Sequence, residues 1–293
     1  MQQAIISDPF QVVHNMLPPD ELNKLPIAKI MNLANGEEAQ GNLPDAVRYW
    51  AEIAKRPQTS EPNTTPEEFF ANQRMAYFNI GARYAQQCTA TNDKNEKIKF
   101  FQSALSALLP IHASAYRLPQ TSLYLGILHE NVAIFYLAAM QTEEQAEAIA
   151  PLFVEATKYY EVAASMDDYD NKKYPQTAAN CLGCFYARGI GVEKDVEKAF
   201  AWHLKGAEGG WWEAQINVAV SLYLGRGTEQ SLPQASEWLD KALPQIPENN
   251  PLKSEATYFL AQIARETGSM PSRPEALKVS EVLKDLAVKT PEL

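Results

Sequence analysis

The residue pattern with the clearest chemical potential is Cys181-Leu182-Gly183-Cys184, a C-x-x-C pair. Two thiols at this spacing occur in redox sites and in zinc sites. A structural zinc needs four ligands, and the sequence has no second C-x-x-C and no close histidine pair. The pair also lies in a segment with helical periodicity, where a buried cysteine behaves as a small apolar residue. We therefore expect a packing role and no metal site.

Three other patterns fall short of the chemistry they suggest. His129-Glu130 begins like the H-E-x-x-H zinc motif, but Ala133 stands where the second histidine belongs, so we expect a hydrogen-bonded histidine at a repeat interface. The acidic stretch Asp167–Asn171 lacks the glycine and the distal glutamate of a calcium loop. Gly189-Ile190-Gly191 lacks the third glycine and the preceding strand of a dinucleotide-binding turn. The sequence thus predicts no enzyme and no cofactor.

Charge argues against a nucleic-acid partner. The chain has 293 residues and a net charge of -10, from 36 acidic and 26 basic residues, without a long basic run. Nucleic-acid binding draws most of its affinity from phosphate neutralisation, which needs a basic surface. The three cysteines are too few and odd in number for a disulfide framework, which fits a reducing compartment.

The N-terminus and the most apolar segment indicate a cytoplasmic protein. Lys24 is the first basic residue and Asp8-Pro9 interrupts the apolar stretch, so no secretory signal is expected. The segment Ser122–Met140 carries His129, Glu130 and Asn131 at its centre, which favours a buried helix over a membrane span. Delivery by a specialised secretion route remains open.

The elements that would position any site are helices in pairs, because apolar residues recur at three- and four-residue spacing without sustained alternation. The predicted helices are Pro26–Ala39, Leu43–Lys55, Glu67–Gln87, Asn95–Leu109, Leu123–Met140, Glu143–Ala164, two further pairs between Gln176 and Gln245, Lys253–Thr267 and Pro274–Val288. Gly41 suits the turn between the first two. The fold class is all-α, with about six helix pairs.

A strict repeat occupies the two pairs between Gln176 and Gln245. Ala178 recurs 36 residues later as Ala214, and the same step relates Gly189 to Gly225, Gly191 to Gly227, Trp202 to Trp238 and Lys205 to Lys241. Such a period indicates a helical solenoid. The glycines suit turns with positive backbone angles. Asp195 and Ser231 suit helix N-caps, and Ser231 with Gln234 fits a capping box.

The motif Leu182-Gly183-x-x-Tyr186-x-x-Gly189-x-Gly191 followed by Lys198-Ala199-x-x-Trp202 closely resembles the SEL-one-like repeat, a variant of the tetratricopeptide repeat. The second copy has Ala219, Leu222, Thr228 and Ser231 where the first has Gly, Tyr, Val and Asp. Upstream, Gly41-Asn42-x-x-Asp45-Ala46-x-x-Tyr49-Trp50 resembles ordinary tetratricopeptide repeats.

The resemblance implies a right-handed α-solenoid that binds other proteins, and no catalytic residues. Its expected parts are an N-terminal extension (1–25), divergent tetratricopeptide-like pairs (26–172), two SEL-one-like repeats (173–246) and a divergent capping pair (247–293). Many bacterial relatives are exported with a signal peptide, which this sequence lacks. Absence of such a signal argues against an envelope role.

The resemblance also places candidate partner-binding residues on the concave face lined by the first helices. They are Asn79, Arg83, Asn131, Asn180, Arg188 and Asn217. Asparagine can bond a peptide backbone as donor and acceptor, and arginine can grip a carboxylate with two bonds. Trp212, next to Trp211, either wedges between repeats, which we favour, or offers an anchor to a partner. Most of the other aromatic residues, including Phe70 and Tyr77, are predicted to be buried in the core.

The sequence therefore predicts a non-enzymatic scaffold or adaptor that binds a protein or peptide. Two alternatives stay open. One is a regulatory sensor that changes curvature when a peptide or small ligand binds, and the other is a bacterial secreted effector that engages a host protein.

Overall fold

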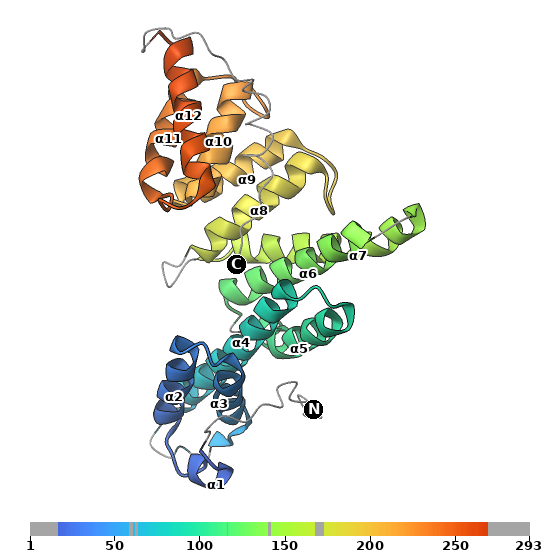
Figure 1. Cartoon of the computed structure of the whole chain (residues 1–293), viewed down its shortest axis with the longest axis vertical. Coiled ribbons are helices and arrows are strands. Elements are labelled where there is room, and N and C mark those ends of the chain that lie inside the picture. The colour runs from blue at the N-terminus through green and yellow to red at the C-terminus, as the bar shows by residue number, and fades with distance from the viewer. Residues whose placement is uncertain are drawn as a thin grey trace. The chain divides into compact units, whose positions relative to one another are not determined.

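The computed structural model describes residues 17–58, 61, 64–115, 117–139, 142–167 and 173–268. Over these ranges the chain forms twelve α-helices, and none of the described residues lies in a strand. The chain divides into two compact units, Met1–Val132 and Ala133–Leu293 (Figure 1). The predicted all-helical fold of paired helices is confirmed. The predicted helix Pro274–Val288 and most of the acidic loop lie outside the described residues.

The first unit is a series of helices joined by short turns. They are α1 (Pro19–Leu22), α2 (Ile27–Ala39), α3 (Leu43–Lys55), α4 (Pro66–Ala90), α5 (Lys94–His112) and the greater part of α6 (Pro119–Ala139). Each of α2, α3 and α4 packs against the next helix in the chain. Gly41 has a φ of 81°, which confirms the left-handed turn predicted between α2 and α3.

Local capping explains where the long helices of the first unit begin. The Thr65 hydroxyl accepts the N–H of Glu68 at 3.3 Å, and the Glu68 carboxylate accepts the N–H of Thr65 at 3.1 Å. This capping box starts α4 at Pro66, one residue before the predicted start. Asp93 accepts the N–H groups of two residues in the first turn of α5.

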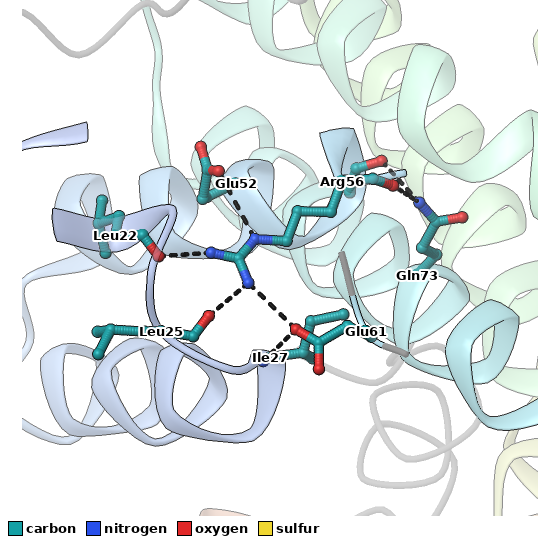
Figure 2. A network of polar contacts seen from close by, with 8 residues as sticks. Leu22, Leu25, Ile27, Glu52, Arg56, Glu61 and Gln73 are labelled. Atoms are coloured by element: carbon teal, nitrogen blue, oxygen red, sulfur yellow. Dashed lines mark hydrogen bonds and ion pairs between the residues drawn. The ribbon is translucent and has the colours of Figure 1, made fainter. Parts of the chain in front are cut away.

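Arg56, which follows the last residue of α3, bonds the segment from the end of α1 to the turn before α2 (Figure 2). Its side chain is buried and donates to the carbonyl oxygens of Leu22 and Leu25, both at 2.5 Å. The guanidinium also lies 3.2 Å from Glu61 Oε1 and 3.7 Å from Glu52 Oε1. A planar fork with five donors suits this arrangement, because it can satisfy carbonyls and carboxylates at once. Nothing in the sequence pattern singled this residue out.

Helix α6 is long and apolar enough to cross a membrane by length and composition alone. However, 56% of its apolar window is buried inside the protein. His129 and Glu130 at its centre are also buried, and His129 Nδ1 lies 2.7 Å from the carbonyl oxygen of Leu125. Phe101 of α5 meets the His129 ring edge-on at 5.2 Å. These contacts are those of a core helix, as predicted.

The second unit continues the pairing of helices (Figure 1). Its helices are α7 (Glu143–Ala164), α8 (Tyr174–Arg188), α9 (Val196–Glu208), α10 (Trp212–Leu224), α11 (Leu232–Ala242), a short 3₁₀ turn η2 (Leu243–Gln245) and α12 (Pro251–Glu266). Each helix from α7 to α11 packs against the next. Lys205 lies over the Trp202 ring at 5.3 Å, and Lys241 repeats the contact over Trp238 at 4.2 Å.

Glycine in the repeat turns serves both backbone conformation and close packing. Gly189, Gly191, Gly225 and Gly227 all have positive φ, between 64° and 74°, as predicted. A Cβ at Gly191 would stand 2.5 Å from the carbonyl oxygen of Phe153 in α7. A Cβ at Gly227 would likewise collide with the backbone of Val196. Each turn therefore rests directly on the second helix of the preceding pair.

The two predicted N-caps behave differently. Asp195 caps α9 by accepting the N–H groups of Glu197 at 3.1 Å and Lys198 at 2.9 Å, as predicted. Ser231 has nearly the same backbone conformation but makes no side-chain cap, so the predicted capping box is wrong. One reason is Pro233, which replaces Glu197 at the second helical position and has no N–H to donate.

Candidate functional site

Arg83, a predicted binding residue on α4, is engaged within the first unit. Its Nε and Nη2 donate to Glu38 at 3.0 Å and 2.6 Å, and its Nη1 donates to Gln86 at 2.7 Å. Trp50 Nε1 donates to the same Glu38 carboxylate at 3.1 Å. The fork therefore ties α4 to α2. Asn79 lies half-buried one turn before Arg83.

Asn131, near the end of the first unit, also has a neighbour on α4. Its Nδ2 donates to the hydroxyl of Thr89 at 3.3 Å. The side chain is partly exposed, so part of its bonding capacity faces solvent. The structure places Asn79, Arg83 and Asn131 along α4 and α6. Their role in binding a partner remains a prediction.

An open apolar groove of about 510 Å³ lies in the first unit between α4 and the C-terminal end of α5. Its lining residues are Pro66, Glu67, Phe70, Gln73, Arg74, Tyr77, Pro110, Ile111 and Ser114. Phe70 is 48% exposed and meets the buried Phe69 edge-on at 5.6 Å. The sequence assigned Phe70 and Tyr77 mainly to the core, since helical spacing alone does not show which aromatic residues lie at an open groove.

Asn180 and Asn217 lie inside the second unit, which corrects the expectation that they face the surface. Asn180 is fully buried and Asn217 is 6% exposed. The Asn180 Oδ1 accepts the Nδ2 of Asn217 at 2.9 Å and lies 3.2 Å from Nδ1 of His203. Side chains from α8, α9 and α10 thus meet at one oxygen. A direct contact of either asparagine with a partner remains a prediction.

His203 is neutral in this environment. Burial, together with the positive charge of Arg188, lowers its pKa from 6.5 to about 3. A carbonyl oxygen only accepts hydrogen bonds, so His203 carries its proton on Nδ1 and donates it to Asn180. Its Nε2 is then left as an acceptor. No sequence pattern pointed to this role, because His203, Asn180 and Asn217 come together only through helix packing.

Arg188 and Trp212 end up in different settings. Arg188 is exposed, and its Nε donates to the carbonyl oxygen of Cys184 at 3.2 Å. Trp211 and Trp212 are both partly buried against the core formed by α10, α11 and α12. Trp211 Nε1 donates to Glu213 at 2.7 Å. Burial raises the pKa of Glu213 to about 7 despite this bond.

The cysteine pair that suggested chemistry by its spacing is packed away from solvent. Cys181 and Cys184 are both buried in α8. Within the described ranges, no three His, Cys, Asp or Glu side chains gather in a way that could hold a metal ion. His112 Nδ1 lies 3.0 Å from the Ser122 hydroxyl, but Ser122 is fully buried and cannot meet a substrate.

A second, polar pocket of about 370 Å³ lies in the second unit between α9 and α10. It is lined by Ala187, Lys194, Val196, Ala199, His203, Asn217, Val220, Ser221 and Arg226. Two features of this lining were predicted from the sequence, namely the repeat turns and Asn217. The other polar lining residues, His203, Lys194 and Arg226, were not predicted as site residues.

A sequence model of the family described as Sel1 repeat matches residues 132–168, 177–211 and 212–243. The second and third matches cover the strict repeat. The first covers the end of α6 and α7, which the sequence had grouped with the tetratricopeptide-like pairs. No curated protein is significantly similar to this chain.

Solved structures that are similar to this chain include two helical repeat proteins. A Sel1 repeat protein from Oxalobacter formigenes has a TM-score of 0.52 at 19% identity, over 94% of this chain and 90% of that one. The protective antigen c5321 of uropathogenic Escherichia coli strains, which displays an SLR fold, has a TM-score of 0.37 at 15% identity, over 89% of this chain and 60% of that one. At such identity the first likeness supports the fold alone.

Proposed function

Since the chain is a Sel1-like repeat protein, we propose that it is a non-enzymatic adaptor that binds a peptide segment of another protein on its first-helix side. Proteins built from Sel1 repeats generally serve as scaffolds for protein–protein interaction. A solenoid also works through extended surface, because its repeats contact only their neighbours and leave long faces open.

The observation that carries the proposal is the apolar groove beside α4. Large apolar side chains in soluble proteins are exposed singly without consequence, but a half-exposed aromatic ring at the edge of a hollow is typical of a binding site. Phe70 and Tyr77 supply flat apolar area, and Pro110 and Ile111 of α5 form the opposite wall. The groove fits a large apolar side chain of a bound peptide, which would serve as its anchor.

The rim of the same groove can hold the peptide backbone. Glu67 and Gln73 offer side-chain acceptors, which match backbone N–H groups. Gln73 already donates to the carbonyl oxygen of Arg56 at 2.8 Å, which fixes its side chain in place. A fixed side chain loses little entropy when it binds. The groove is thus preorganised at one end.

A peptide selection on the purified full-length chain tests the proposal. Random twelve-residue peptides displayed on phage are selected on the wild type, and the recovered sequences are tested against Phe70→Ala and Met75→Ala. Met75 is a matched control, since it is also exposed (39%) on α4 but does not line the groove.

We expect the selected peptides to share a large aromatic or aliphatic residue and to lose binding with Phe70→Ala only. Selected peptides that bind both variants as well as the wild type would contradict the assignment to this groove. A ligand-responsive sensor and a secreted effector would use the same physics, and no described feature favours either.

A further inference from the structure

The polar pocket between α9 and α10 has a floor of hydrogen-bond acceptors. His203 directs its Nδ1 toward α8, where this atom lies 3.2 Å from the Asn180 Oδ1. The other ring nitrogen, Nε2, has no hydrogen-bond partner among the described residues. Asn217 uses Nδ2 to bond Asn180, which leaves its Oδ1 as a second acceptor. The floor therefore suits a ligand that donates a hydrogen bond.

The rim of the pocket is positively charged. Lys194 and Arg226 line it and are exposed, and no acidic side chain in the described part of the chain pairs with either. Two acids flank Lys194 in sequence. Glu193 does not line the pocket, and Asp195 caps α9 and lies 3.5 Å from Lys198. Two unpaired cations on a protein of net charge -10 leave a local positive surface.

The pocket is peculiar to this junction and is not a feature of every repeat. One 36-residue step earlier, Ile190 stands in the place of Arg226, and one step later Gln230 stands in the place of Lys194. Arg226 is held at the pocket because its neighbour Gly227 packs directly on the backbone of Val196. The repeat architecture thus supplies the hollow, and non-repeating residues supply its charge.

We infer that this pocket binds an acidic residue of a partner peptide. The side-chain carboxylate would lie between Lys194 and Arg226, and a backbone N–H of the same residue would donate to His203 Nε2 or Asn217 Oδ1. An acidic residue within a peptide is the simplest group that combines an anion with a nearby N–H donor. The peptide nature of the ligand rests on the proposed function, whereas the anion-plus-donor chemistry stands on the pocket itself.

Nuclear magnetic resonance titration of the full-length chain tests this inference. The probe is N-acetyl-glutamate N-methylamide, and its uncharged isostere N-acetyl-glutamine N-methylamide is the matched control. We expect saturable shifts of the backbone amides in Val196–Ala199 and Ser221–Gly227 with the glutamate probe only. Lys194→Gln with Arg226→Gln should weaken binding by about tenfold or more, since each loses a charge-assisted bond. Lys158→Gln with Arg265→Gln, which removes one lysine and one arginine elsewhere in the unit, should leave binding unchanged.

Equal shifts with the two probes, or equal binding by the double variant and the wild type, would overturn the inference. Tighter binding of inorganic phosphate than of the glutamate probe would overturn the assignment to a carboxylate. Phe70→Ala separates this inference from the proposed function, because that variant should bind the glutamate probe normally. The selection can yield no peptide that depends on Phe70 while the glutamate probe still binds as expected. That result would contradict the proposed function and would still support anion binding at the pocket.

Discussion

His203 packs so closely on Gly183 that a Cβ at position 183 would stand 2.4 Å from the imidazole Nδ1. One 36-residue step later, the same two places are taken by Ala219 and Leu239, both fully buried. The size of the first-helix residue is thus matched to its neighbour on the second helix. A glycine is required where the neighbour is a ring that must also reach Asn180.

Replacing Gly183 with alanine should therefore destabilise the second unit. The methyl group has no room unless the His203 ring moves, and that movement would break its bond to Asn180. We expect a loss of about 2 kcal/mol or more in the free energy of unfolding, measured by urea denaturation. Gly36→Ala is the control, because a Cβ there would have no neighbour within 4 Å apart from the adjacent backbone of its own helix, and helix propensity alone should stabilise by about 1 kcal/mol. Equal stability of Gly183→Ala and wild type would contradict this packing.

Glu213 and His203 should act on stability with opposite signs as pH changes. The pKa of Glu213 is raised from 4.5 to about 7, so between these values the folded chain holds a proton that the unfolded chain has released. Its stabilising effect is present at low pH and is lost as pH rises through 7. The pKa of His203 is lowered from 6.5 to about 3, so its contribution is present above pH 6.5 and is lost as pH falls.

Glu213→Gln should remove one of these two opposing pH effects on stability and so reveal the other. Glutamine keeps an acceptor for Trp211 but has no charge to bury, so the variant should gain about 1–3 kcal/mol at pH 8 and little at pH 4.5. Between pH 7 and pH 5 the variant should lose stability more steeply than the wild type, because His203 then acts unopposed. Urea denaturation at several pH values measures both effects. A gain that is the same at pH 8 and pH 4.5 would show that Glu213 is not held protonated.

Arg56→Lys should destabilise the first unit although charge is conserved. Lysine cannot reach the carbonyl oxygens of Leu22 and Leu25 and the carboxylate of Glu61 together, so buried acceptors lose their partner (Figure 2). We expect a loss of about 2–4 kcal/mol and faster hydrogen exchange in α1 and α2. Arg117→Lys, at an exposed arginine of the same unit, is the control and should cost less than about 1 kcal/mol. Similar losses in the two variants would argue against a special role for Arg56.

The repeat made most of the fold predictable. Periodicity and caps predicted α3 and α7 with the bounds observed, and the 36-residue echo predicted the glycine turns. The start of α6 at Pro119 was missed by four residues, since apolar spacing begins only at Leu123. Ser231 was predicted as an N-cap from its residue type alone. Asp195 accepts two backbone N–H groups of α9, whereas Pro233 leaves α11 without the N–H at the first of these two positions.

The candidate sites were predictable only in part. A family pattern can place Asn180 and Asn217 on first helices, but burial depends on the neighbouring helix, and here that neighbour is His203 of α9. Phe70 follows the same helical spacing as core aromatics, so its exposure appears only once α5 is in place. Long-range packing, which sequence spacing does not encode, decides both cases.

The most direct test of the adaptor function is an equilibrium titration of one selected peptide, labelled with a fluorophore, against the full-length chain. Fluorescence anisotropy would give its Kd for wild type, Phe70→Ala and Met75→Ala, with urea midpoints showing that all three are folded. We expect a Kd at least about tenfold weaker for Phe70→Ala and unchanged for Met75→Ala, as for an aromatic anchor at the centre of an interface. The same Kd for all three proteins would contradict the groove as the peptide-binding site.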